Sequence, residues 1–157
     1  MKEYDELFDR IVKIAKDTYE RDGHHEPLLL PLLGTGLAAR PIDVGPFLEN
    51  EAGKDALARA VRSAAGITGI NGYVLVTEAW LSQPDAARYV AATALPPSKD
   101  PERKEVLNVV MVSTAPTPRY ARQCSIEIER GKVIELVADG RETPDNPLGG
   151  RFGSMLP

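Results

Sequence analysis

The stretch that decides the fold is Tyr73-Val74-Leu75-Val76-Thr77-Glu78-Ala79-Trp80, in the middle of a chain of 157 residues. It is rich in β-branched and aromatic side chains, which favour a strand. Successive side chains of a strand point to opposite faces, so Val74 and Val76 share a face with Glu78, while Tyr73 and Leu75 lie on the other. Because both faces are apolar over most of this length, we predict a central strand that is covered on both sides.

Further strands are expected on both sides of this one in the sequence. Three follow it, over 106–113, 120–128 and 133–137, and a turn with Gly131 at its bend makes the last two a hairpin of an antiparallel meander. Before it, a hairpin is expected over 27–42, around the turn Gly34-Thr35-Gly36. Proline cannot donate to a strand ladder, so Pro31 and Pro41 favour a place at the sheet edge.

Two helices are predicted. The first runs from Lys2 to about Arg21, because its apolar residues recur in steps of three and four. The second covers 46–65 with Pro46 at its first position; Gly53 weakens its first half, so Asn50 or Asp55 is an alternative start. We therefore predict an α+β fold in which two helices pack on a mainly antiparallel sheet, in the order α-β-β-α-β-β-β-β. Residues 1–138 are expected to form one domain, and residues 139–157 an extended or mobile tail rich in Gly and Pro.

The composition limits the class of protein. Hydrophobic residues make up 43% of the chain, which suffices for a core, and the net charge is -4. A net negative charge disfavours partners such as nucleic acid or acidic lipid. The longest apolar run, residues 28–33, is far too short to cross a bilayer, and no apolar leader stands at the N-terminus. The single Cys124 cannot form an internal disulfide, so no oxidising compartment is indicated and we expect a cytoplasmic protein. From the charge and the short apolar run, we expect neither nucleic-acid nor membrane partners.

Three residues are candidates for chemistry: Glu78, Asp100 and Arg103. Glu78 ends a largely apolar row, where a carboxylate needs a cation or several hydrogen-bond donors, otherwise its pKa rises. Arg103 could be its bidentate partner if the two strands are neighbours. Asp100, with Ser98, lies in the charged and proline-rich segment just before the strand at 106–113. These residues form either a small polar site or a purely structural ion pair, and both interpretations stay open.

Metal and cofactor sites are not expected. His24 and His25 are the two histidines, and adjacent side chains on an extended chain point to opposite sides, so they do not chelate one metal together. The Gly34-Thr35-Gly36 turn lacks the remaining glycines of a dinucleotide-binding loop. Cys124 has no His near it in the sequence, and a buried small hydrophobic residue is the better interpretation. No nucleophile and base can be paired from the sequence.

Two segments carry a resemblance to other proteins. Thr77-Glu78-Ala79-Trp80 and the segment from Pro97 to Leu107 (PSKDPERKEVL) resemble a group of small uncharacterised bacterial and phage proteins. These share an (S/T)-E-A-W strand end, followed by P-S-x-D-P-x-R-x-E-V-L, and they are similar in the leading helix and in a His-Glu-Pro stretch. The resemblance implies that Glu78, Trp80, Asp100 and Arg103 act together, but it implies no activity.

Two functions from different classes remain. The first is a non-enzymatic accessory protein, phage-derived, that binds another protein or self-assembles into a homo-oligomer, with Trp80, Ser98 and His25 as candidate binding residues. The alternative is a small hydrolase or ligand-binding enzyme, with Glu78 as acid or base and Arg103 holding an anion. A pocket that encloses Glu78 and Arg103 would favour the enzyme, and whether the protein is one is left open.

Overall fold

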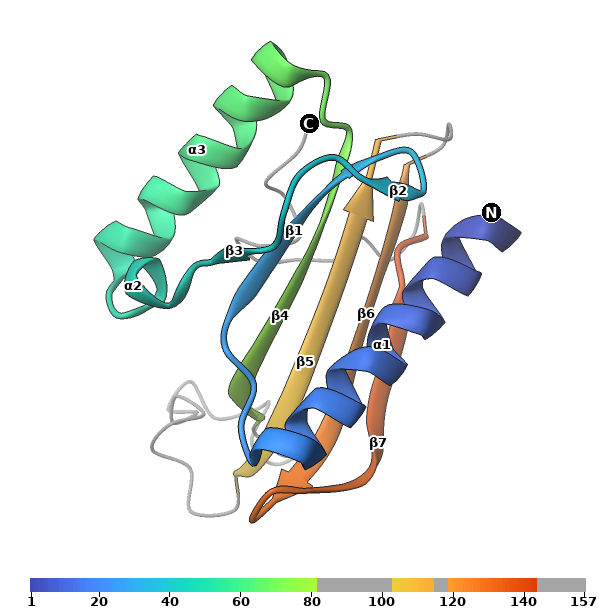
Figure 1. The fold of residues 1–157 in the computed structure, drawn as a ribbon, viewed down its shortest axis with the longest axis vertical. Helices are drawn as coiled ribbons and strands as arrows, with labels where there is room; N and C mark the ends of the chain where they lie inside the picture. The colour runs from blue at the N-terminus through green and yellow to red at the C-terminus, as the bar shows by residue number, and fades with distance from the viewer. Residues whose placement is uncertain (82–102, 115–118, 144–157) are drawn as a thin grey trace, which may run out of the picture.

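The fold is known from a computed structural model, which describes residues 1–81, 103–114 and 119–143 (Figure 1). Its elements in chain order are α1 (Lys2–Asp22), β1 (Leu28–Leu33), β2 (Gly36–Leu37), β3 (Ile42–Asp43), α2 (Gly45–Leu48), α3 (Glu51–Thr68), β4 (Gly72–Leu81), β5 (Lys104–Ser113), β6 (Tyr120–Glu129) and β7 (Lys132–Arg141). A helical turn that the sequence suggests at 84–90 lies outside the described residues, as does the chain from 144 to 157.

The strands form one antiparallel sheet in the order β2-β1-β4-β5-β6-β7, and β3 also pairs with β1. The β4–β5 pair is the longest ladder, from Gly72 opposite Ser113 to Leu81 opposite Lys104. The α+β class and the mainly antiparallel sheet are thus confirmed. The meander β5–β6–β7 is confirmed as well.

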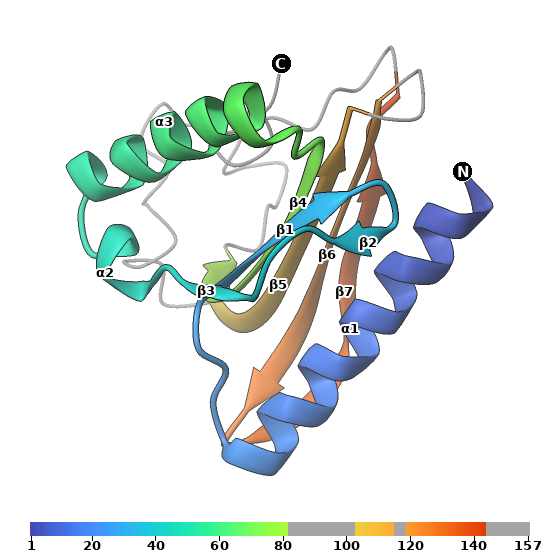
Figure 2. The same cartoon turned by 45° about the horizontal axis from the view of Figure 1, so that its top comes forward.

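The sheet lies between helices, with a separate core on each face. Helix α1 packs on one face, against a cluster that includes Val74 and Val76. Helix α3 covers the other face, against a cluster that includes Tyr73 and Leu75 (Figure 2). Residues 72–77 of β4 are all buried. The expected two-faced burial of this strand is therefore confirmed.

Helix α1 is held by one apolar face. The buried side chains of this face are Tyr4, Phe8, Ile11, Ala15 and Tyr19. The helix ends where Gly23 takes a φ of 75°, a left-handed conformation that glycine adopts without a steric cost. The amide of Gly23 donates to the carbonyl of Tyr19, which closes the last turn.

The second predicted helix is in fact two, so the described chain has a third, short helix. Helix α2 ends at Leu48, and α3 starts after Asn50, whose side chain accepts a hydrogen bond from the amide of Gly53 at 2.7 Å. A side-chain cap of this kind starts a helix. A Cβ at position 53 would lie 2.5 Å from the carbonyl oxygen of Phe47, so only glycine lets α2 fold back on α3. Asn50 was the alternative start, and it is the correct one.

The expected N-terminal hairpin is present, but its second strand is split into β2 and β3. Pro41, which has no N–H, lies in the break between them. The carbonyl of Pro31 accepts from the amide of Ala38 at 2.9 Å. The backbone N and O of one residue point to the same side of a strand. The nitrogen of Pro31, which carries no hydrogen, therefore also faces the gap between β2 and β3, where no ladder bond is needed. Pro31 can therefore lie in β1, between β2 and β4, rather than at the edge.

The last strand is longer than the sequence suggested. The turn that precedes it holds Arg130 and Gly131 with φ values of 51° and 80°, as a tight hairpin turn requires. Strand β7 continues through Asp139 to Arg141. The boundary between the sheet and the following chain therefore lies at Arg141, not at Ala138.

The burial pattern of α1 gives a first prediction. Ile11 is 8% exposed and Ile14 is 57% exposed on the same helix. We expect Ile11→Asp to lower the free energy of unfolding by more than about 3 kcal/mol, because it buries an unpaired carboxylate. The matched control, Ile14→Asp, should stay within about 1 kcal/mol of the parent. Urea unfolding measures both, and equal losses in the two variants would contradict the packing of α1.

Candidate functional site

The candidate residues of β4 lie where the strand leaves the core. Residues 72–77 are buried, but Glu78 is exposed and Trp80 is 42% exposed. Both belong to the α1 face of the sheet, by the alternation that places Val74 and Val76 there. Trp80 lies opposite Glu105 of β5 in the strand register. The strand therefore presents an indole ring to solvent with an acidic neighbour on the adjacent strand.

Arg103 contacts Trp80 rather than Glu78. Its guanidinium carbon lies over the indole ring, 4.2 Å from the ring centroid, in cation–π geometry. Among the residues that the structure describes, no ion pair joins Arg103 to Glu78. The reason is the register, because Glu78 pairs with Leu107, which is four residues from Arg103, or roughly 13 Å along a strand. The expected Glu78–Arg103 pair is therefore not formed, and Trp80 takes its place.

Glu78 has a different set of neighbours. Burial raises the pKa of this carboxyl, and the negative charge of Glu105 raises it further. The nearby His24 and His25, together with a hydrogen bond from the backbone of His25, oppose this rise without cancelling it. The pKa of Glu78 thus lies above its ordinary value. A carboxyl of this kind is less easily ionised than one in water.

The two histidines have separate roles in the chain between α1 and β1. His25 is buried, with 6% exposed, and its Nδ1 donates to the backbone carbonyl of Glu26 at 2.6 Å. His24 is exposed, and its two ring nitrogens face the carbonyl of Asp22 and the carboxylate of Glu26. Because both partners accept, the pKa of His24 is raised. His25 therefore helps to fix the chain that reaches Glu78.

Two candidate residues, Ser98 and Asp100, lie outside the described residues. In the parts of the chain that the structure describes, no three His, Cys, Asp or Glu side chains are placed so that they could hold a metal ion. Burial raises the pKa of the Cys124 thiol to about 12, and this residue is 2% exposed. The interpretation of Cys124 as a buried side chain is confirmed. None of the described helices is long and apolar enough to cross a membrane.

A second polar group, which sequence analysis missed, joins α1 to β6 and β7. Arg122 makes a bidentate pair with Asp139, at 3.0 and 2.8 Å, and reaches Asp9 at 3.0 Å. Its guanidinium carbon also lies 4.4 Å from the centroid of the Phe8 ring. Arg122 is therefore held by the carboxylates of Asp9 and Asp139 and by one aromatic ring, and Asp5 lies 3.7 Å from its guanidinium. We call it, with the residues below, the Arg122 network.

The Arg122 network continues through Asp5. The Tyr120 hydroxyl donates to Asp5 at 2.9 Å, and Arg141 binds the same carboxylate oxygen at 2.7 Å. Burial raises the pKa of Asp5, but these hydrogen bonds outweigh it and hold the pKa below its ordinary value. The bond from Arg122 likewise lowers the pKa of Asp139. One sequence signal was available: Asp5 and Asp9 are one turn apart on α1, and Tyr120 and Arg122 share a face of β6.

Three arginines near the last hairpin, Arg119, Arg122 and Arg141, are thus engaged within the protein. Besides Arg122, Arg119 forms a two-pronged pair with Glu142, at 2.6 and 3.0 Å. These contacts account for much of the positive charge that the sequence places around β6 and β7. These ion pairs join elements of the fold, and they add no support for a surface that binds nucleic acid.

The geometry defines a small α+β protein with an exposed aromatic and cationic group at one end of its sheet. Residues 1–147 match the family described as bacteriophage lambda protein ea47. The chain therefore belongs to this family, and it is phage-related, as the sequence led us to expect. No curated protein and no solved structure matches the chain at a significant level. The family assignment carries neither a reaction nor a partner.

A double-mutant cycle tests the contacts of Arg103. We expect Trp80→Leu and Arg103→Met to show a coupling of about 0.5–1 kcal/mol in urea unfolding, the usual size of an exposed cation–π contact. The control cycle pairs Glu78→Gln with Arg103→Met and should give less than about 0.5 kcal/mol. Glu78→Gln by itself should not destabilise the protein at pH 7, because the raised pKa disfavours the ionised form. A larger coupling for Glu78 than for Trp80 would restore the ion-pair hypothesis.

The Arg122 network predicts how stability depends on pH. The pKa values of Asp5 and Asp139 are lowered from 3.8, so the stability they contribute is present above about pH 4 and is lost as the pH falls through their lowered values. Asp139→Asn should therefore cost about 1 kcal/mol at pH 7 and lose less stability than the parent between pH 4 and 2. The exposed pair Lys13–Asp17 supplies the control, Asp17→Asn, which should change little. Urea unfolding across this range checks it, and identical pH profiles for Asp139→Asn and the parent would disprove the assignment.

Proposed function

We propose that this member of the ea47 family is a non-enzymatic phage accessory protein that binds another protein through its Trp80–Arg103 surface. The observation that supports it is the exposed indole ring of Trp80 under the guanidinium of Arg103. Tryptophan and arginine are enriched among the residues that dominate protein–protein binding energies. A ring of this size left partly in water is an unused source of binding free energy.

The arrangement of Arg103 on the ring supports recognition in a second way. Stacking on Trp80 holds a long and flexible side chain in one place. Binding therefore costs less conformational entropy than it would for a free arginine. The exposed carboxylates around Trp80, namely Glu78 and Glu105, give the patch a polar rim, as binding surfaces commonly have. The patch suits a partner that buries an apolar or aromatic side chain against the indole ring.

The enzymatic alternative has less support from the same residues. It requires Glu78 and Arg103 to act on one substrate, and Arg103 is engaged with Trp80 instead. One cavity lined by described residues lies on the opposite face of the sheet, against α3, and encloses neither residue. Protein binding is therefore the function that the geometry favours.

Site-specific photo-crosslinking tests the proposal. A photoreactive phenylalanine analogue at position 80, in cells carrying the parent phage, should give one discrete adduct with a protein. The control position is Ile134 on β7, which is 50% exposed and should give no such adduct. An adduct of twice the chain mass would identify the partner as a second copy. Equal labelling from both positions, or none from position 80, would refute the proposal.

The purified partner allows a quantitative check. We expect Trp80→Ala to weaken its binding by about 30-fold or more, the effect of a residue that dominates an interface. The melting temperature should change by no more than a few degrees, because the ring is outside the core. Titration calorimetry and thermal unfolding of one preparation provide both values, and an unchanged affinity would contradict the role of Trp80.

A further inference from the structure

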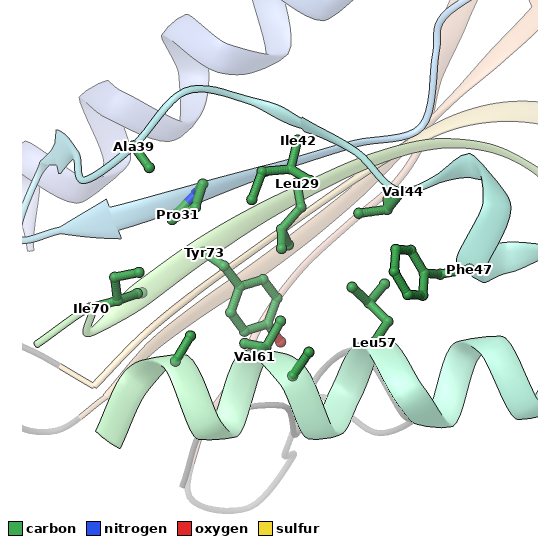
Figure 3. A pocket seen from close by; sticks show the side chains of 13 residues that line it. Leu29, Pro31, Ala39, Ile42, Val44, Phe47, Leu57, Val61, Ile70 and Tyr73 are labelled. Atoms are coloured by element: carbon green, nitrogen blue, oxygen red, sulfur yellow. The ribbon is translucent and has the colours of Figure 1, made fainter. Parts of the chain in front are cut away.

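An apolar cavity of about 270 Å³ lies between α3 and the sheet, on the face opposite to Trp80. Leu57 and Val61 of α3 form one wall, and Leu29 of β1 and Tyr73 of β4 form the other (Figure 3). Protein interiors rarely leave a void much larger than a water molecule. A cavity of this size therefore needs an explanation.

The cavity exists because small residues stand on α3 beside the side chains that pack on the sheet. Ala60 and Ala64 line it from the helix, and Gly72 lines it from β4. The gap is thus built into the helix layer, where alanines stand in place of larger side chains.

The chemistry of the lining selects an apolar occupant. Of the 13 residues that line the cavity, Tyr73 is the one with a polar side-chain atom, and none carries a charge. Water gains little in such a space, because it needs two to four polar partners. A charged group would lose its hydration without compensation. The portion of a ligand that enters must therefore be hydrocarbon.

The size and shape of the cavity limit the class of ligand further. A cavity of about 150 Å³ holds benzene, so this one holds roughly ten non-hydrogen atoms. Its lining on α3 runs from Leu57 to Ala64, which is roughly 10 Å at the rise of a helix, and continues to Ile70. Ile42 and Phe47, which are 44% and 40% exposed, also line it, so it opens to solvent beside them. A volume of about 270 Å³ spread over roughly 10 Å or more of helix leaves a long and narrow space. Its open side also includes the exposed Ala39 and Ala60.

We propose that this cavity binds an unbranched aliphatic chain of about eight to ten carbons, with its uncharged polar end at the opening beside Ile42 and Phe47. The site is separate from the Trp80–Arg103 surface, and either can fail without the other.

The test uses the full chain and two alcohols, 1-decanol and 1-adamantanol. The two have the same number of carbon atoms and one hydroxyl group each, but they differ in shape. 1-Decanol, kept below its solubility limit, should bind saturably in calorimetry and raise the melting temperature by several degrees. 1-Adamantanol should bind at least tenfold more weakly, because its cage does not fit a narrow space. Absence of saturable decanol binding, or equal binding of both alcohols, would overturn the proposal.

Variants of α3 locate the site. Ala60→Phe and Ala64→Phe, made separately so that one misfolded variant leaves the other, should reduce decanol binding at least tenfold. Ala52→Phe is the matched control, since Ala52 is exposed on the same helix and is not part of the lining. It should bind decanol as the parent does. Undiminished binding in a folded Ala60→Phe or Ala64→Phe protein would overturn the proposal.

Discussion

The burial of β4 and β5 on both faces is the constraint on which the rest of the structure depends. A strand that is apolar on two sides needs two covers, and the chain supplies them from separate segments, α1 before the first hairpin and α3 after it. Charged groups are excluded from β4 until the strand passes beyond the helices. Glu78 and Trp80 lie just after this point, so the position of the candidate surface follows from the extent of the core.

The two covers are packed differently. On the α1 face, large side chains such as Phe8 and Tyr120 fill the space, and the Arg122 network closes the side toward β7. On the α3 face, alanines line the helix and leave a cavity. Cavities cost stability in proportion to their volume. The packing against α1 thus contributes more to stability, whereas the packing against α3 loses some stability because it leaves a cavity.

The sequence predicted those parts of the fold that depend on local periodicity. The strands of the meander, helix α1 and the two faces of β4 follow from alternation and from three- and four-residue steps. The break before α3 was harder to predict from the sequence, because it depends on the side-chain cap of Asn50. The candidate site was harder still to predict. The sequence indicated that the strands of Glu78 and Arg103 are neighbours, but it did not indicate the register that separates these two residues. Arg122 was missed because its partners on α1 lie more than a hundred residues away.

The Arg122 network also sets an order of events during synthesis. Helix α1 is made first, but its partners Tyr120 and Arg122 follow Asp5 and Asp9 by 115 and 113 residues. At about 5–20 residues per second, translation reaches them roughly 6–23 s later. Throughout that interval the apolar stripe of α1 has no β6 to cover it. A nascent chain of this protein therefore carries an amphipathic helix whose cover stays incomplete until β6 is made, and chaperones that bind such helices gain access to it before the sheet is complete.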